Sequence, residues 1–159
     1  MKFLCDQMLG TLAKWLRLLG FDTFYANTEI TDEELLEIAK RDNRTIISRD
    51  KGLVRSGKKQ KLDVIEMYDT DLDDQLNKVL EIIKINENLI LSRCTICNTI
   101  LEDIEKNRVK DRVPKKVFEN NEKFWFCSKC DKYYWTGSHY DKIIEKINEI
   151  TKRNNSNGS

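Results

Sequence analysis

The first half of the chain alternates short apolar runs with longer stretches in which apolar residues recur every three or four positions. The short runs predict strands, at residues 2–5, 23–26, 45–48 and 62–67. The periodic stretches predict amphipathic helices, at residues 9–19, after residue 31 and over residues 72–83. Strands that alternate with helices favour right-handed crossovers and a mainly parallel sheet. We therefore expect an α/β domain with helices on both faces of the sheet.

Two local signals predict where helices begin and end. Gly20 follows the last apolar position of the first helix and is expected to end it, because glycine adopts the left-handed conformation without steric cost. Thr31 is followed three residues later by Glu34, which is the spacing of a capping box. This pair predicts the N-terminus of the second helix.

The pattern changes after residue 88, and we expect a second domain there. Residues 94–135 have no helical periodicity and contain two Cys-x-x-Cys pairs. A terminal helix is predicted to start at Ser138-x-x-Asp141 and to bury a row of isoleucines, namely Ile143, Ile144, Ile147 and Ile150. We expect the polar end of the chain to fray from residue 151. The predicted division is an α/β domain at residues 1–88, a second domain with its closing helix at 89–152 and a disordered tail at 153–159.

Four of the five cysteines form two pairs at the spacing of metal-binding knuckles: Cys94, Cys97, Cys127 and Cys130. Two such pairs can close a tetrahedral Zn²⁺ site, and the long segment between them is typical of a zinc ribbon. Two disulfides or four buried thiols are the alternatives, and disulfides need an oxidising compartment. The start of the chain has no secretory pattern, and no segment is long and apolar enough for a membrane span. We expect structural zinc, a cytoplasmic location, no membrane partner and a buried core position for Cys5.

Acidic residues stand at the ends of predicted strands and the starts of predicted helices. Asp6 and Asp50 end two strands, and Asp32 begins the second helix. Because ligands of a parallel sheet bind outside the carboxyl ends of its strands, we expect these carboxylates to converge. Converging carboxylates repel one another unless a hard cation such as Mg²⁺ or Mn²⁺ neutralises them. Possible additional acids are Glu33, Asp69 and Asp71.

Each of these acids also has a purely structural interpretation. Asp32 and Glu33 favour a helix N-terminus through the helix dipole, and Asp71 does the same at the next predicted helix. Asp6 would cap the first helix, and Asp50 would stand in a turn. Taken singly, the structural and the catalytic interpretations are about even. Asp6 and Asp50 together, each at the end of a core strand, favour a functional site.

Several blocks of the chain carry a family pattern. They are FLCDQMLGTLAKWLRLLGFD (residues 3–22), Thr31-Asp32-Glu33-Glu34-Leu35-Leu36, Ile46-Ile47-Ser48-Arg49-Asp50, the two cysteine pairs and Tyr134-Trp135-Thr136-Gly137-Ser138-His139. Together they resemble the Mut7-C ribonuclease family over about residues 1–150. The resemblance implies a PIN-like nuclease fold joined to a zinc ribbon, and metal-dependent cleavage of RNA. It also implies that Asp6 and Asp50 are catalytic acids, with Asp32 as the helix acid and Glu33 next in line.

The cysteine pairs depart from the usual knuckle at one position. Glycine commonly follows the second cysteine, where φ is positive, but here Asn98 and Asp131 stand there. Asparagine and aspartate tolerate that conformation better than most residues. The zinc prediction is therefore kept.

Basic residues are the candidates for contact with RNA, although a net charge of +1 gives no overall basic signature. Lys14 and Arg17 lie three residues apart on the predicted polar face of the first helix, where they would hold a phosphate; plain solvent exposure is an equally good interpretation. The segment between the cysteine pairs adds Lys110, Arg112, Lys115 and Lys116. The nearby aromatic residues suit stacking on unpaired bases, but a small ribbon needs most of them for its core. The role of His139 stays open between capping, domain packing and RNA contact.

The sequence thus predicts a ribonuclease that hydrolyses RNA phosphodiester bonds with Mg²⁺ or Mn²⁺ and binds RNA partly through a zinc ribbon. One alternative is a non-catalytic RNA- or ribosome-binding module. Another is a protein-interaction ribbon with a helper domain. The intact acids at positions 6 and 50 count against a loss of activity.

Overall fold

A computed structural model describes residues 1–157, with the side chains of residues 1–152, and contains two sheets. The larger sheet is parallel, in the order β2-β1-β3-β4: β1 (Phe3–Cys5), β2 (Thr23–Tyr25), β3 (Thr45–Ser48) and β4 (Val64–Glu66). The helical elements between and after these strands are η1 (Gln7–Leu9), α1 (Gly10–Leu18), α2 (Asp32–Arg41), α3 (Lys51–Lys59) and α4 (Leu72–Leu80). The predicted α/β architecture with a parallel sheet is confirmed.

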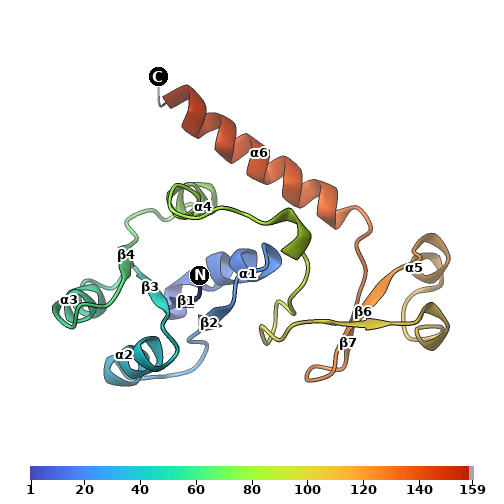
Figure 1. Cartoon of the computed structure of the whole chain (residues 1–159), viewed down its shortest axis with the longest axis horizontal. Helices are drawn as coiled ribbons and strands as arrows, with labels where there is room; N and C mark the ends of the chain where they lie inside the picture. Colours follow the sequence, from blue (N-terminus) through green and yellow to red (C-terminus); the bar gives the residue numbers. More distant parts are fainter. Residues whose placement is uncertain (158–159) are drawn as a thin grey trace.

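Successive residues of the central strand β1 point to opposite faces of the sheet, and each face has its own helices. Phe3 and Cys5 lie in one core with α1 and α4, whereas Leu4 lies in a second core with α2 and α3. All three are fully buried, as expected when both faces of a parallel sheet are covered. Figure 1 shows α4 on one side of the sheet and α2 on the other. Burial raises the pKa of the Cys5 thiol above its ordinary value, so Cys5 is the neutral core residue that we predict.

Both helix-boundary signals are confirmed. The Thr31 hydroxyl accepts a hydrogen bond from the N–H of Glu34 at 3.2 Å, and the Glu34 carboxylate accepts one from the N–H of Thr31 at 3.0 Å. Gly20 follows α1 with φ of +93°, and a Cβ there would lie 2.5 Å from the carbonyl oxygen of Leu89. Gly20 therefore ends the helix. Because it has no side chain, the segment around Leu89 that leads into the second sheet can pass close to its backbone.

The pattern of the sequence does not predict α3. Only Leu53, Val54 and Gly57 of this helix are buried, and glycines at positions 52 and 57 lower its helix propensity. Tertiary contacts supply what the pattern lacks, because Leu53 packs in the core beneath the sheet and Asp50 caps the first turn. Asp50 is thus an N-cap and not merely a turn residue.

The second sheet is antiparallel and carries the cysteine pairs. Its order is β5-β6-β7, formed by β5 (Glu102–Ile104), β6 (Phe124–Cys127) and β7 (Lys132–Tyr134). Three short helical segments that the sequence does not predict accompany it: η2 (Glu87–Leu89), η3 (Lys106–Arg108) and α5 (Lys115–Asn120). Trp125 and Tyr134 pack against Cys94, Leu101 and Cys127 in a small core, as we expect for the aromatic residues of a ribbon. We refer to residues 92–135 as the ribbon.

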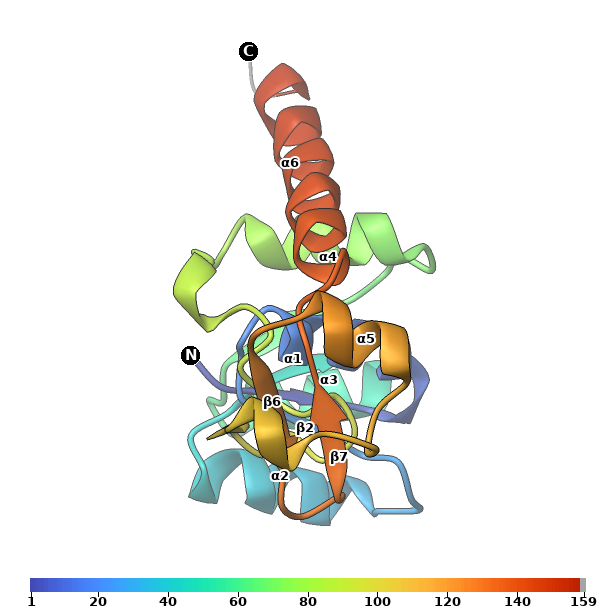
Figure 2. The same cartoon turned by 90° about the vertical axis from the view of Figure 1, so that its right-hand side faces the viewer.

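The terminal helix α6 (His139–Asn157) returns from the ribbon to the parallel sheet. Ile143 and Ile150 are buried in the core that holds α1 and α4, and Figure 2 shows α6 rising over α4. The closing helix therefore packs on the first domain, although it follows the ribbon in the sequence. It continues past residue 151, where we expect fraying, and residues 158–159 of the predicted tail lie outside the described residues.

No helix in residues 1–157 combines the length and the apolar character that crossing a bilayer requires.

Arg17 holds the first cysteine pair against the parallel sheet. Its Nε donates a hydrogen bond to the carbonyl of Thr23 at 3.0 Å, and its Nη1 donates to the carbonyls of Thr95 and Ile96 at 2.9 and 3.1 Å. Only 8% of the residue is exposed. The prediction that Arg17 binds an RNA phosphate does not hold, because the guanidinium is buried and committed to protein carbonyls.

Candidate active site and metal centre

The strand order places a topological switch point between β1 and β3, and ligands of such sheets bind at the carboxyl ends of the strands there. Asp6 follows β1, and Ser48 ends β3. Their side chains meet, because the Ser48 hydroxyl donates a hydrogen bond to Oδ2 of Asp6. Asp6 is buried, with 7% of its surface exposed. A predicted catalytic acid therefore lies at the point of the fold that is best suited to a ligand.

Backbone N–H groups hold both of the strand-end carboxylates. The N–H of Met8 donates to Oδ1 of Asp6 at 3.1 Å. The N–H groups of Gly52 and Leu53 donate to Oδ1 of Asp50 at 2.8 and 3.1 Å, which leaves Oδ2 for another partner. The capping roles considered from the sequence are thus present for both residues. They also fix the two carboxylates in place, which a binding site requires.

Asp32 completes a pocket of about 330 Å³ at this edge of the sheet. It begins α2, and it lines the pocket together with Asp6 and Asp50. Partial burial, followed by the charges of Asp50 and Asp6, raises the pKa of the Asp32 carboxyl above its ordinary value. Asp6 and Asp50 are therefore close enough to oppose the ionisation of Asp32. A bound cation would relieve this repulsion.

Glu29 lines the same pocket, and our sequence analysis missed it. It lies in the loop between β2 and α2, at the carboxyl edge of the sheet. The signal that identifies Asp6, an acid shortly after a predicted strand, also applies to Glu29.

The three additional acids proposed from the sequence do not line this pocket: Glu33, Asp69 and Asp71. Asp71 caps α4 instead. Its Oδ2 accepts hydrogen bonds from the N–H groups of Asp73 and Asp74 at 3.1 and 3.4 Å. The capping role considered from the sequence is therefore present for Asp71, which lies outside the pocket.

The carboxylates surround their pocket more loosely than the cysteines surround theirs. Among the described residues, the four cysteines are the one group of three or more possible ligands whose ligand atoms all lie within 4.8 Å of one another. Mg²⁺ keeps several waters and is usually held by one or two carboxylates together with substrate phosphates. The arrangement of the acids fits an open site of this kind rather than a closed cage.

The cysteine cluster has the geometry of a closed zinc site. The Sγ atoms of Cys94 and Cys130 are 3.9 Å apart, and those of Cys97 and Cys127 are 3.4 Å apart. Sulfurs at the usual bond length around a tetrahedral Zn²⁺ lie about 3.8 Å from one another. A disulfide bond is only about 2.05 Å long. The cluster therefore matches a four-cysteine metal site and not two disulfides.

Asn98 and Asp131 adopt the positive φ that the knuckle requires, +73° and +52°. This confirms the expectation for both positions. Asn98 also does what a glycine could not: its Oδ1 accepts from the N–H of Thr23 at 3.0 Å, and its Nδ2 donates to Asp22 at 2.7 Å. The first knuckle is thereby tied to the edge strand β2 of the parallel sheet.

The thiols of the cluster differ strongly in acidity when no metal is bound. Burial opposes ionisation of Cys97, but hydrogen bonds with Thr99 and with neighbouring thiols outweigh it and lower the pKa of Cys97 to about 6. Hydrogen bonding to Cys97, together with burial, raises the pKa of Cys130 to about 12. Four sulfurs this close cannot all ionise without a counter-charge, and a divalent cation would supply it.

The basic candidates lie away from the acid pocket. Lys14 lines a second cavity, between α1, the ribbon and α6, and His139 lines the same cavity. The four cations between the cysteine pairs are exposed at and before α5: Lys110, Arg112, Lys115 and Lys116. Figure 1 shows α5 and α3 near opposite ends of the long axis of the molecule, so these cations are far from the helix that Asp50 caps.

The fold and the site define an α/β domain with an acidic pocket at its switch point, joined to a four-cysteine ribbon. A model of the Mut7-C RNAse domain family matches residues 1–147 of the 159-residue chain. The chain therefore belongs to this family, which confirms the resemblance noted from the sequence. Comparisons with curated proteins and with solved structures gave no match. Membership places the chain in a ribonuclease family with RNA as the implied substrate.

Proposed function

We propose that this protein is a metal-dependent ribonuclease whose active site is the acid pocket. One observation carries the proposal: Asp6, Asp32 and Asp50 come from separate parts of the chain and line one pocket at the switch point of the sheet. The family match supports cleavage of RNA, and the acidity of the pocket supports a requirement for Mg²⁺ or Mn²⁺.

The three acids have distinct parts in this proposal. Asp6 is the most firmly held, because Ser48 and the N–H of Met8 both donate to it. Asp50 offers Oδ2, the oxygen that its capping bonds leave over. Asp32 has a raised pKa, so a neighbouring positive charge would favour its ionised form. A Mg²⁺ or Mn²⁺ ion held by these carboxylates would activate water and stabilise the charge that develops on the phosphate.

The ribbon has two parts in the proposed function. Zinc in the cysteine cluster would be structural, because four thiolates leave no open position for a substrate. The exposed cations around α5 would add affinity for the RNA backbone without contacting the bond that is cut.

A non-catalytic RNA- or ribosome-binding module is the second candidate. It is favoured by the hydrogen bonds of Asp6 and Asp50, because a protein without turnover would still need both residues as caps. The two candidates differ in what happens when Mn²⁺ is added. A nuclease binds the ion in the acid pocket and cuts RNA, whereas a binding module retains intact RNA.

The test is cleavage of labelled single-stranded and structured RNA with and without Mn²⁺. Asp6→Asn and Asp50→Asn should each lower the cleavage rate by about two orders of magnitude or more, the scale of losing a metal ligand or its support. Both variants should fold, since asparagine caps a helix as well as aspartate does. Asp71→Asn is the matched control, because Asp71 also caps a helix but lies outside the pocket. Equal activity in all three variants would refute the proposed active site.

A further inference from the structure

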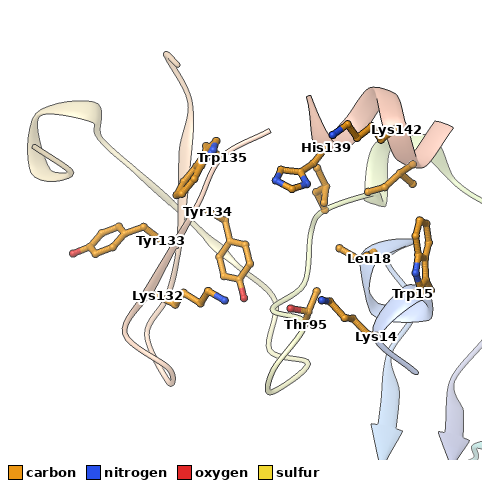
Figure 3. Close-up of a pocket in the computed structure, with 12 residues that line it drawn as sticks. Lys14, Trp15, Leu18, Thr95, Lys132, Tyr133, Tyr134, Trp135, His139 and Lys142 are labelled. Atoms are coloured by element: carbon orange, nitrogen blue, oxygen red, sulfur yellow. The ribbon is translucent and has the colours of Figure 1, made fainter. Parts of the chain in front are cut away.

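The cavity that Lys14 lines is a cleft of about 410 Å³, and it is separate from the acid pocket. Figure 3 shows side chains from α1, from the ribbon and from the start of α6 around it. The three segments are far apart in the sequence and meet only because the ribbon docks beside α1. Of the described residues that line the cleft, every charged one is a lysine: Lys14, Lys132 and Lys142.

The walls of the cleft are aromatic. Tyr134 and Trp135 line it from the ribbon, and Trp15 lines it from α1. The Tyr134 hydroxyl is hydrogen-bonded to Sγ of Cys94 at 3.0 Å, which holds the ring in place. In Figure 3 the Tyr134 ring lies on the side of the ribbon strand that faces α1, whereas the Tyr133 ring lies on the opposite side. Lys146 lies over the Trp15 ring, 5.4 Å from its centre, so one face of that ring already carries a cation.

The lysines of the cleft are available to an anion. In the part of the chain that the structure describes, none of Lys14, Lys132 and Lys142 is in a salt bridge, and all three are exposed. Lys132 leans over the Tyr134 ring, 5.4 Å from its centre. A ligand that suits the cleft must therefore present both a flat apolar face and negative charge. A nucleotide has both, and a duplex keeps its base faces stacked inside.

We propose that the cleft binds an unpaired nucleotide of the RNA, with its base against Tyr134 and Trp135 and its phosphates on the lysines. This inference rests on RNA being the substrate of the protein. Met8 lines the acid pocket and Lys14 lines the cleft, and they stand on the adjoining η1 and α1, about 10 Å apart along the helix. One strand can therefore occupy the cleft while a neighbouring phosphate lies at the acids. The cleft would select RNA that is single-stranded near the cut.

The experiment is binding of a fluorescein-labelled single-stranded RNA, and of a blunt duplex of the same length, across a salt series without added Mg²⁺ or Mn²⁺. Each phosphate contact contributes about 0.7 to the slope of log affinity against log salt concentration for a single strand. Replacing Lys14, Lys132 and Lys142 by Gln should therefore reduce the magnitude of this slope by about 2. Trp135→Leu should weaken single-strand binding about tenfold. The matched control replaces three exposed lysines outside the cleft, Lys40, Lys59 and Lys123, and should change the slope less.

We expect the cleft variants to lose more affinity for the single strand than for the duplex. Equal losses for both RNAs, or unchanged single-strand binding in the lysine and Trp135→Leu variants, would overturn the proposal and leave the cleft to a protein partner. Zinc content at the wild-type level shows that the ribbon of each variant is folded. Cleavage by the wild-type protein with Mn²⁺ is measured separately: if it cuts RNA while the cleft variants bind normally, the cleft inference fails and the ribonuclease proposal stands.

Discussion

The parallel-sheet domain and the ribbon become stable by different means. The largest fully buried side chains of the described residues all lie in the parallel-sheet domain or in α6, among them Phe3, Leu12 and Ile46. The ribbon core has Cys94, Leu101 and Cys127 at its centre with partly buried residues around them, and Val109 and Phe124 are the other buried apolar residues described in the ribbon. Apolar burial can hold the first region, whereas a core as small as the second generally needs a metal. The contrast leads us to propose that the same chain combines a hydrophobic fold with one that depends on a bound metal.

The two candidate metal sites differ in the same way. The cysteine sulfurs lie within 4.8 Å of one another and form a closed set. At the other site Asp6 and Asp50 cap helices, and the three acids line a pocket of about 330 Å³. A closed set suits a structural ion, and an open one suits an ion that must also contact substrate.

The largest effect should come from removing one zinc ligand. The wild type is expected to hold about one Zn per chain. Cys94→Ser should lose this zinc and unfold the ribbon, because structural zinc contributes about 10–16 kcal/mol of folding free energy. Hydrogen exchange should then lose protection over residues 94–135 and retain it in β1 and β3. Cys5→Ala is the control, since Cys5 is buried in the other core. Full zinc and native protection in Cys94→Ser would show that the ribbon is not a metal-dependent fold.

The next effect tests the junction between the two regions. Arg17→Met should destabilise the protein by about 3 kcal/mol, because the carbonyls of Thr23, Thr95 and Ile96 lose their buried charged donor. Lys14→Met, on the same helix but exposed, should change stability by about 0.5 kcal/mol or less. Urea unfolding of both variants measures the difference. Equal midpoints would mean that the guanidinium contributes little to docking of the ribbon.

A smaller effect is expected from the cations around α5. Neutralising Lys110, Arg112, Lys115 and Lys116 together should weaken RNA binding. At about 0.7 per phosphate contact, it should reduce the magnitude of the slope of log affinity against log salt concentration by at most about 2.8. The Nζ of Lys115 lies 3.9 Å from Oε1 of Glu119, so part of the lysine's charge is already compensated. Cleavage at saturating RNA should stay near the wild-type rate, since these residues are far from the acid pocket. An unchanged salt slope would make this segment a solvated face only.

The smallest effect concerns the pH dependence of stability. The folded-state pKa of Asp32 is raised above the unfolded value, so ionisation of Asp32 destabilises the fold as pH rises through that pKa. Asp32→Asn should therefore raise the melting temperature at pH 7 slightly, and the gain should vanish below about pH 3.9, where the carboxyl is protonated in both states. Glu33→Gln, the adjacent acid outside the pocket, is the control.

Added Mn²⁺ gives the second half of this test. The ion should stabilise the wild type more than Asp32→Asn, because the carboxylate that repels its neighbours becomes a ligand. An Asp32→Asn protein that is less stable than the wild type at pH 7 without metal would contradict the repulsion that we infer between Asp32 and its two neighbours.

The sequence by itself determined the features that depend on near neighbours in the chain. The capping box at Thr31, the helix end at Gly20 and the strand at Thr45–Ser48 follow from local conformational preferences, and the structure has all three. The two Cys-x-x-Cys pairs are equally local, because their spacing sets the sulfur positions within each knuckle. The convergence of Asp6 and Asp50 needed one rule more, that parallel strands share a carboxyl edge.

Tertiary structure alone decided which polar residues face solvent and which face another part of the chain. Lys14 and Arg17 stand on one helix and look equivalent in sequence, yet Arg17 is buried because the first knuckle docks over it, while Lys14 is exposed in the cleft. The helix α3 and the return of α6 to the first core likewise depend on contacts between distant segments. Periodicity reports which side of an element is apolar, but it carries no information about what arrives on the polar side.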